Sequence, residues 1–107
     1  MQKTFVVRNA GDEDRIKAHF DDRVQKMGKH LSHFRDDLVY LHGSLERNPH
    51  REEFHAALSL YLPSAALHCR ERAEDYVTAL NKVFLSLARQ IDKHKEKLGK
   101  EKRRKER

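Results

Sequence analysis

The sequence is poor in the residues that cross-links, metal clusters and membrane spans require. Its 107 residues include one cysteine, Cys69, so neither an intrachain disulfide nor a thiolate metal cluster is expected. It has no tryptophan, two prolines and four isolated glycines, which excludes a glycine-rich phosphate loop. No run approaches the roughly 20 apolar residues of a membrane span, and the first residues contain no signal-peptide apolar region. These absences predict a cytoplasmic protein without a membrane partner.

Patterns typical of catalysis are also missing. The eight histidines show neither HxH nor HExxH spacing and have no cysteine partner, so we expect no metal and no other cofactor. Cys69 alternates with apolar residues of a predicted strand, which favours a small core residue over a nucleophile. We therefore expect a protein that is not an enzyme.

Hydrophobic periodicity predicts four strands and two helices. Apolar residues spaced by three or four indicate amphipathic helices, and alternation of apolar and polar residues indicates strands. In chain order we predict a strand at 3–8, a helix ending near His33, strands at 37–47, 52–62 and 66–70, and a helix at 73–98.

This order predicts an α+β fold with two layers, β-α-β-β-β-α, like that of double-stranded-RNA-binding domains. We expect a four-stranded sheet with two helices packed on one face, because both helices have one apolar stripe to bury. The other face of the sheet is expected to be polar. We place the folded domain at residues 1–98 and a basic, disordered tail at 99–107.

The net charge of +6 lies entirely at the C-terminal end of the chain. Residues 1–92 hold 14 Lys and Arg against 14 Asp and Glu, whereas residues 93–107 hold nine against three. A helix that is apolar on one side and cationic on the other docks by its apolar face and offers its cations to an anionic partner. On the last predicted helix these cations are Lys82, Arg89, Lys93, Lys97 and Lys100, with Lys95 nearer the apolar edge.

A second, weaker row of basic residues flanks the apolar stripe of the first predicted helix. Asp22 interrupts this row, so an ordinary solvated face is the alternative interpretation. Contacts from either row to RNA would be mostly to phosphates, since RNA helices hide their base edges from side chains. The row consists of Arg15, His19, Arg23, Lys26, His30 and His33.

The C-terminal part of the sequence resembles a known family. The block LARQIDKHKEKL at 87–98, preceded by Leu67-His68-Cys69 and Ala73-Glu74-Asp75, is similar to the end of the ribosome hibernation factors. This family includes the ribosome-associated inhibitor (protein Y) and the hibernation promoting factor, and was earlier labelled sigma-54 modulation protein. Over residues 1–62 the resemblance rests on topology and helix length. The length of the chain agrees with that of the short form of the family, which does not have the second, dimerisation domain of the long form.

The resemblance implies a translation inhibitor that binds the small ribosomal subunit against 16S rRNA. Family members occupy the path of mRNA and tRNA and silence idle ribosomes under stress. By position, the resemblance implies that Arg89, Lys93, Lys95 and Lys97 face rRNA. Ser86 occupies a position where the family pattern has a lysine, and Lys82, one turn earlier, is expected to supply the missing contact. The full set expected to bind rRNA is Arg23, Lys26, His30, Lys82, Arg89, Lys93, Lys95, Lys97 and Lys100.

Two other functions stay open at this point. One is a general module for structured RNA, and the other is a protein-interaction module that modulates a transcription factor through the sheet face. Ribosomal proteins are candidate additional partners, and we expect a monomer off the ribosome. The sequence does not decide whether binding promotes or prevents ribosome dimers.

Overall fold

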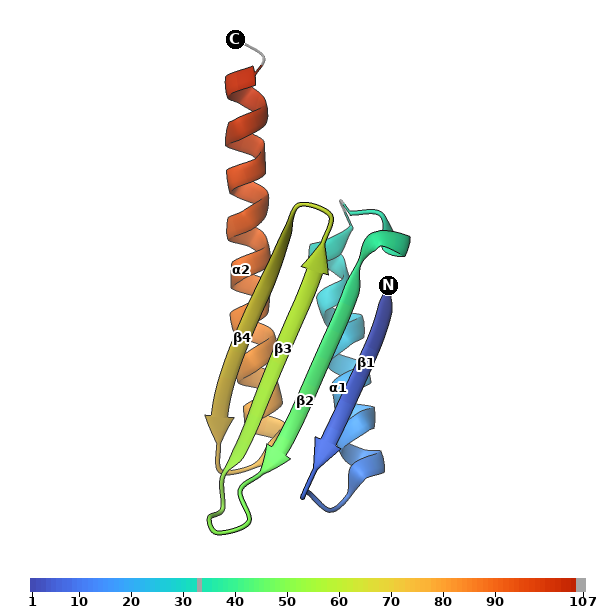
Figure 1. Cartoon of the computed structure of the whole chain (residues 1–107), viewed down its shortest axis with the longest axis vertical. Coiled ribbons are helices and arrows are strands. Elements are labelled where there is room, and N and C mark those ends of the chain that lie inside the picture. The colour runs from blue at the N-terminus through green and yellow to red at the C-terminus, as the bar shows by residue number, and fades with distance from the viewer. Residues whose placement is uncertain (33, 106–107) are drawn as a thin grey trace.

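The computed structural model describes residues 1–32 and 34–105, with side chains described through Gly99. Four strands and two long helices follow the predicted order (Figure 1). No helix in the described part of the chain is long and apolar enough to cross a membrane. The elements are β1 (Gln2–Arg8), α1 (Glu13–Met27), the 3-10 helices η1 (Gly28–Leu31) and η2 (Asp36–Leu38), β2 (Tyr40–Arg47), β3 (Phe54–Leu62), β4 (Ala65–Ala73) and α2 (Tyr76–Lys105).

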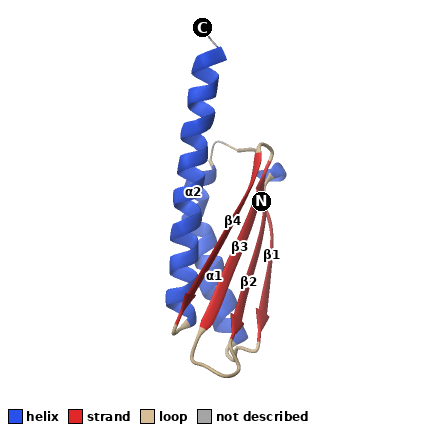
Figure 2. Ribbon diagram, turned by 60° about the vertical axis from the view of Figure 1, so that its left-hand side comes forward, coloured by secondary structure: helices blue, strands red, loops and turns tan. Residues whose placement is uncertain are grey.

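The strands form one mixed sheet in the order β1-β2-β3-β4. β1 runs parallel to β2, and the remaining pairs are antiparallel. Both helices cover the same face of the sheet, and no described segment crosses the other face (Figure 2). This two-layer arrangement confirms the predicted fold class, because each helix buries one stripe against the single apolar sheet face.

The core lies between the helices and the sheet. α1 contributes the predicted stripe of Ile16, Phe20, Val24 and Met27, each at most 6% exposed. Burying an apolar side chain of this size contributes roughly 1.5–3 kcal/mol, so the packed stripe holds α1 on the sheet. α2 contributes Ala79, Leu80, Val83, Phe84, Leu87 and Ile91, and the sheet contributes residues including Leu41, Leu45, Leu58 and Leu60.

Gly43 allows α1 to approach the sheet closely. The Phe20 ring stacks on Phe5 with centroids 4.0 Å apart, directly above β2. A Cβ atom at position 43 would lie 2.7 Å from Phe20 Cε2 and 3.1 Å from a Leu58 methyl carbon. Glycine is therefore needed here for space, not for an unusual backbone conformation.

Both predicted helix ends are corrected by the structure. The first helix was expected to reach about His33, but α1 ends at Met27 and continues as η1 through Leu31. His33 lies outside the described residues. The second helix was expected to end at Leu98, but α2 runs to Lys105. An isolated Gly99 among strong helix formers costs only about 1 kcal/mol, too little to stop the helix.

The strand boundaries also differ from the prediction, and the third strand begins at Phe54 and not at Glu52. The second strand begins at Tyr40 and not at Asp37, because residues 36–38 form η2. The fourth strand is longer than expected, since its pairing with β3 runs from Ala65 to Ala73. At the end of β4, Asp75 caps α2: its carboxylate accepts hydrogen bonds from the Thr78 backbone N–H at 2.7 Å and from the Thr78 hydroxyl at 2.9 Å. These bonds, the backbone one foremost, lower the pKa of Asp75.

Candidate nucleic-acid interface

The outward face of α2 carries a row of three exposed cations: Arg89, Lys93 and Lys97. They are spaced by four residues, so they follow one side of the helix at steps of about 6 Å along its axis. None of the three forms an ion pair with any residue that the structure describes. The opposite side of α2 is packed in the core through Ile91, so the helix holds the first part of the row outward, and the helical backbone continues the row to Lys97. We call these three residues the α2 cation row.

Lys82 lies on the same side of α2, nearer the start of the helix, but its ammonium group already has partners on the sheet. Its ammonium group donates a hydrogen bond to the Arg72 carbonyl at 3.0 Å and lies 4.0 Å from the Glu71 carboxylate. Both partners belong to β4, so Lys82 ties the start of α2 to the edge of the sheet. The side chain is half exposed, which leaves it at the margin of the α2 cation row.

Lys95 and His30 are used in the contact between α2 and η1. The Lys95 ammonium donates to the His30 carbonyl at 3.0 Å, and His30 Nδ1 lies 2.9 Å from the Asp92 carboxylate. The hydrogen bond from His30, followed by the charges of His30 and Lys95, lowers the pKa of Asp92. The structure therefore places two predicted RNA-binding residues in a polar cluster that joins the two helices.

The two lysines of α1 are matched by acids on the same helix. Lys26 lies 3.0 Å from Asp22, and Lys17 lies 3.1 Å from Glu13, each pair one turn apart. Such exposed pairs add only about 0.3–0.5 kcal/mol of stability, but each places a carboxylate beside the cation. A phosphate group would meet that negative charge as well.

Among the other members of the first-helix row, His19 faces α2 and Arg23 is partly buried. His19 Nε2 lies 2.9 Å from the Asn81 side-chain oxygen. The Arg23 Nε atom is buried and has no hydrogen-bond partner within the described part of the chain. Arg15 is exposed on the outer side of α1. The side chain of Lys100, the last predicted contact, lies outside the described side chains.

Cys69 occupies the core position that the sequence predicted. It is 5% exposed, and its thiol accepts a hydrogen bond from the Gln90 side-chain amide at 3.1 Å. Burial is the main cause that raises the pKa of the thiol. Because the thiolate is the reactive form, this environment keeps Cys69 unreactive.

The fold and the basic outer helix define a class of small α+β domains with known three-dimensional relatives. The N-terminal domain of protein Y from Thermus thermophilus superposes with a TM-score of 0.72 at 15% identity, over 88% of this chain and 99% of that one. A ribosomal subunit interface protein from Coxiella burnetii gives a TM-score of 0.72 at 11% identity, over 90% and 99% of the two chains. At these identities the likeness establishes the fold.

Family membership follows from the sequence itself. The family described as sigma 54 modulation protein / S30EA ribosomal protein matches residues 4–99, and the chain belongs to this family. A search of curated proteins finds no significant match. The matched range spans most of β1, the other three strands, α1 and most of α2, so the family domain coincides with the packed part of the molecule.

Proposed function

We propose that the protein binds the small ribosomal subunit through the outer face of α2 and inhibits translation by occupying the path of mRNA and tRNA. The observation that carries this proposal is the α2 cation row, which is outward, regularly spaced and unmatched by acids in the described part of the chain. Phosphates of 16S rRNA are the partner of matching charge, and family membership directs the proposal to the ribosome.

The proposed mechanism requires no turnover. A rigid domain measuring 57 × 23 × 18 Å blocks a site by filling it, and contacts to phosphates fix its position without reading sequence. Lys82 lies on the same side of α2 and extends the row at its start, and the sequence spacing predicts the same side for Lys100. Arg23, Lys26, His30 and Lys95 take a supporting part in this scheme, since Lys26, His30 and Lys95 are engaged with neighbouring groups and Arg23 is partly buried.

The biological setting follows from the same proposal. A protein that fills the mRNA and tRNA path silences ribosomes that carry neither ligand, the state of idle ribosomes under stress or in stationary phase. Its place of action would be the cytoplasm, where ribosomes are. We propose that the protein is a monomer when it is not bound to the ribosome, because one chain supplies every residue that is proposed to contact rRNA.

The direct test is sedimentation of the purified protein with small subunits and whole ribosomes, with and without bound mRNA and tRNA. We expect co-migration with empty particles and loss of co-migration when mRNA and tRNA fill the channel. Co-migration that is indifferent to mRNA and tRNA would contradict occlusion. Equal binding to bulk structured RNA would favour the general RNA-binding alternative, and binding that is insensitive to salt would favour a protein partner.

A further inference from the structure

The sheet face opposite the helices presents ordered cross-strand rows. Strand register places Gln2, Tyr40, Tyr61 and Ala66 side by side in the first row, and Thr4, His42, Ser59 and His68 in the second. The third row is Val6, Ser44, Ala57 and Arg70. We call these three rows the sheet platform. None of its positions is an Asp or Glu, in a chain that has 17 of them.

Two tyrosine rings form the aromatic part of the sheet platform. The rings of Tyr40 and Tyr61 lie with centroids 5.8 Å apart and are inclined by 35°. His68 stands edge-on to Tyr61, at 6.0 Å and 82°. Tyr61 is 44% exposed. The exposed Tyr61 ring and the partly exposed Tyr40 ring thus place two aromatic side chains next to each other on this face.

Hydrogen bonds between platform residues hold the rings in place. Thr4 Oγ1 lies 2.9 Å from the Tyr40 hydroxyl and 2.6 Å from His42 Nδ1, which links β1 to β2. Ser59 Oγ lies 2.8 Å from His68 Nδ1, which links β3 to β4. Side chains that are ordered before binding lose less conformational entropy on binding, so the sheet platform is prepared for a ligand.

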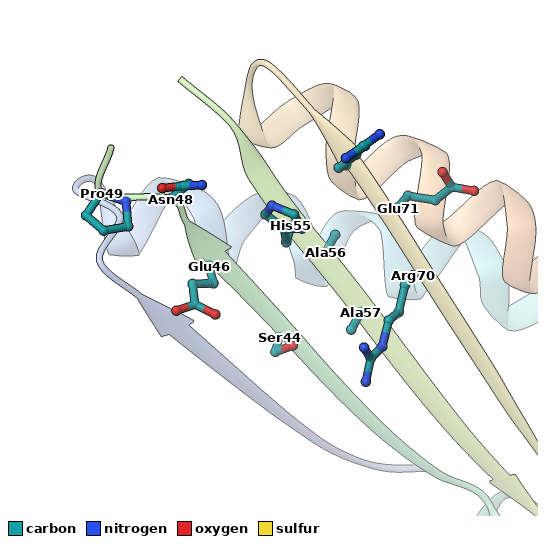
Figure 3. A pocket seen from close by; sticks show the side chains of 10 residues that line it. Ser44, Glu46, Asn48, Pro49, His55, Ala56, Ala57, Arg70 and Glu71 are labelled. Carbon is teal, nitrogen blue, oxygen red and sulfur yellow. The ribbon is translucent and has the colours of Figure 1, made fainter. Parts of the chain in front are cut away.

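A cation and a shallow hollow lie on the same sheet face, two cross-strand rows away from the tyrosine rings. Arg70 is exposed, forms no ion pair within the described part of the chain, and lies beside the small side chains of Ala57 and Ser44 (Figure 3). The hollow continues past these residues to His55 and Glu46. Glu46 is a carboxylate, but it lies in the next cross-strand row, beyond the sheet platform.

We propose that the sheet platform binds an unpaired, single-stranded RNA segment, with two bases stacked on Tyr40 and Tyr61 and a phosphate paired with Arg70. A four-stranded sheet that displays aromatic side chains is one way in which proteins hold single-stranded bases. The missing carboxylates and the unmatched Arg70 favour a phosphate-bearing chain over a basic or neutral peptide. This surface is separate from the α2 cation row and does not rest on the function proposed above.

The test is a titration of the full chain with an unstructured oligo(A) RNA of eight nucleotides and with an RNA duplex of equal length. Two of the three tyrosines lie on the sheet platform, Tyr76 begins α2, and there is no tryptophan, so tyrosine emission comes mainly from the platform rings. We expect the single strand to quench this emission. Tyr61→Ala is expected to weaken single-strand binding about 5- to 150-fold, the loss typical of one stacked base.

Matched variants separate stacking from other causes. Tyr61→Phe keeps the ring and should bind like the unaltered protein, whereas Arg70→Ala should reduce the magnitude of the salt slope by about 0.7. Arg89→Glu/Lys93→Glu, on the other side of the molecule, should leave single-strand binding unchanged. Circular dichroism of each variant verifies folding.

Three results would overturn the proposal. One is the absence of single-strand binding at low salt, which would leave a protein as the occupant of this face. Another is a Tyr61→Ala variant that binds as tightly as the unaltered protein. The third is loss of single-strand binding in Arg89→Glu/Lys93→Glu, since the RNA would then sit on α2. Co-sedimentation of Tyr61→Ala with small subunits reports the helix-face function separately, so the two proposals fail independently.

Discussion

The two helices bury similar apolar stripes but present different charges to solvent. Each packs large aliphatic and aromatic side chains on the same sheet face, and Phe20 of α1 meets Phe84 of α2 with ring centroids 5.5 Å apart. On the outside, lysines of α1 lie beside carboxylates one turn earlier, as Lys26 does beside Asp22. The cations Arg89, Lys93 and Lys97 of α2 have no such partner among the described residues.

The difference shows that the number of basic residues on a helix is a poor guide to its function. A cation that is matched by an acid adds little to the field that attracts phosphate, whereas an unmatched row adds its full charge. α1 is therefore interpreted as the structural helix and α2 as the binding helix. Four predictions follow from this division of roles.

The largest expected effect is on α1, where Phe20→Ala should lower the free energy of unfolding by about 3–5 kcal/mol. Phe20 is 1% exposed and packs against Phe5 and Phe84. Urea unfolding would measure the change. Leu85→Ala, which alters a half-exposed residue of α2, serves as the control and should stay within about 0.5 kcal/mol. Equal losses in both variants would contradict the packing of Phe20 in the core.

Gly43→Ala tests how closely α1 is seated on the sheet. The added methyl group would meet the Phe20 ring at 2.7 Å, and overpacking of this kind costs about 1–3 kcal/mol. Thermal unfolding would measure the loss. Gly11→Ala is the control, because a Cβ at position 11 would meet nothing within 4 Å. If Gly43→Ala proved neutral, α1 would have more freedom on the sheet than the structure indicates.

On α2 the expected effect is on binding and not on stability. Arg89→Glu/Lys93→Glu removes two phosphate contacts, so the log–log salt slope of binding to small subunits should shrink in magnitude by about 1.4–1.8. Binding measured over a series of salt concentrations gives the slope. An unchanged slope would show that these two side chains do not reach phosphate.

The smallest effect concerns the cap of α2. Because hydrogen bonds lower the pKa of folded Asp75, its stabilising contribution is complete above the unfolded value of about 3.9. This contribution is lost as the pH falls through the lower folded pKa. Asp75→Ala should therefore be less stable than the unaltered protein at pH 7, and the difference should shrink at acidic pH. A difference that is independent of pH in urea titrations would argue against the cap.

The fold could be predicted because the sequence periods are strong. The stripe Ile16, Phe20, Val24 and Met27 is apolar at helical spacing, and every member is buried. Phe54, Ala56, Leu58, Leu60 and Leu62 alternate along β3, and those beyond Phe54 are all buried. The helix ends were harder to place, because Gly28 and Gly99 are weak stop signals without a neighbouring proline.

The predicted site was harder to judge than the fold. The pairs Glu13–Lys17 and Asp22–Lys26 are visible in the sequence as charges four residues apart. The contacts of Lys95 and Asp92 with His30 join positions more than 60 residues apart in the sequence. Sequence periodicity describes only local spacing, so it does not predict such contacts. The pairing of Tyr40 with Tyr61 likewise depends on strand register, which the sequence alone did not determine.

The measurement that tests the division between the helices most directly is co-sedimentation of two matched double variants with small ribosomal subunits at low salt. Arg89→Glu/Lys93→Glu alters the α2 cation row, and Arg15→Glu/Lys17→Glu makes the same change of charge on α1, at exposed cations outside the set proposed to bind rRNA. We predict that the α2 variant stays at the top of the gradient while the α1 variant sediments with the subunit. Equal loss in both variants, or binding by both, would contradict the account.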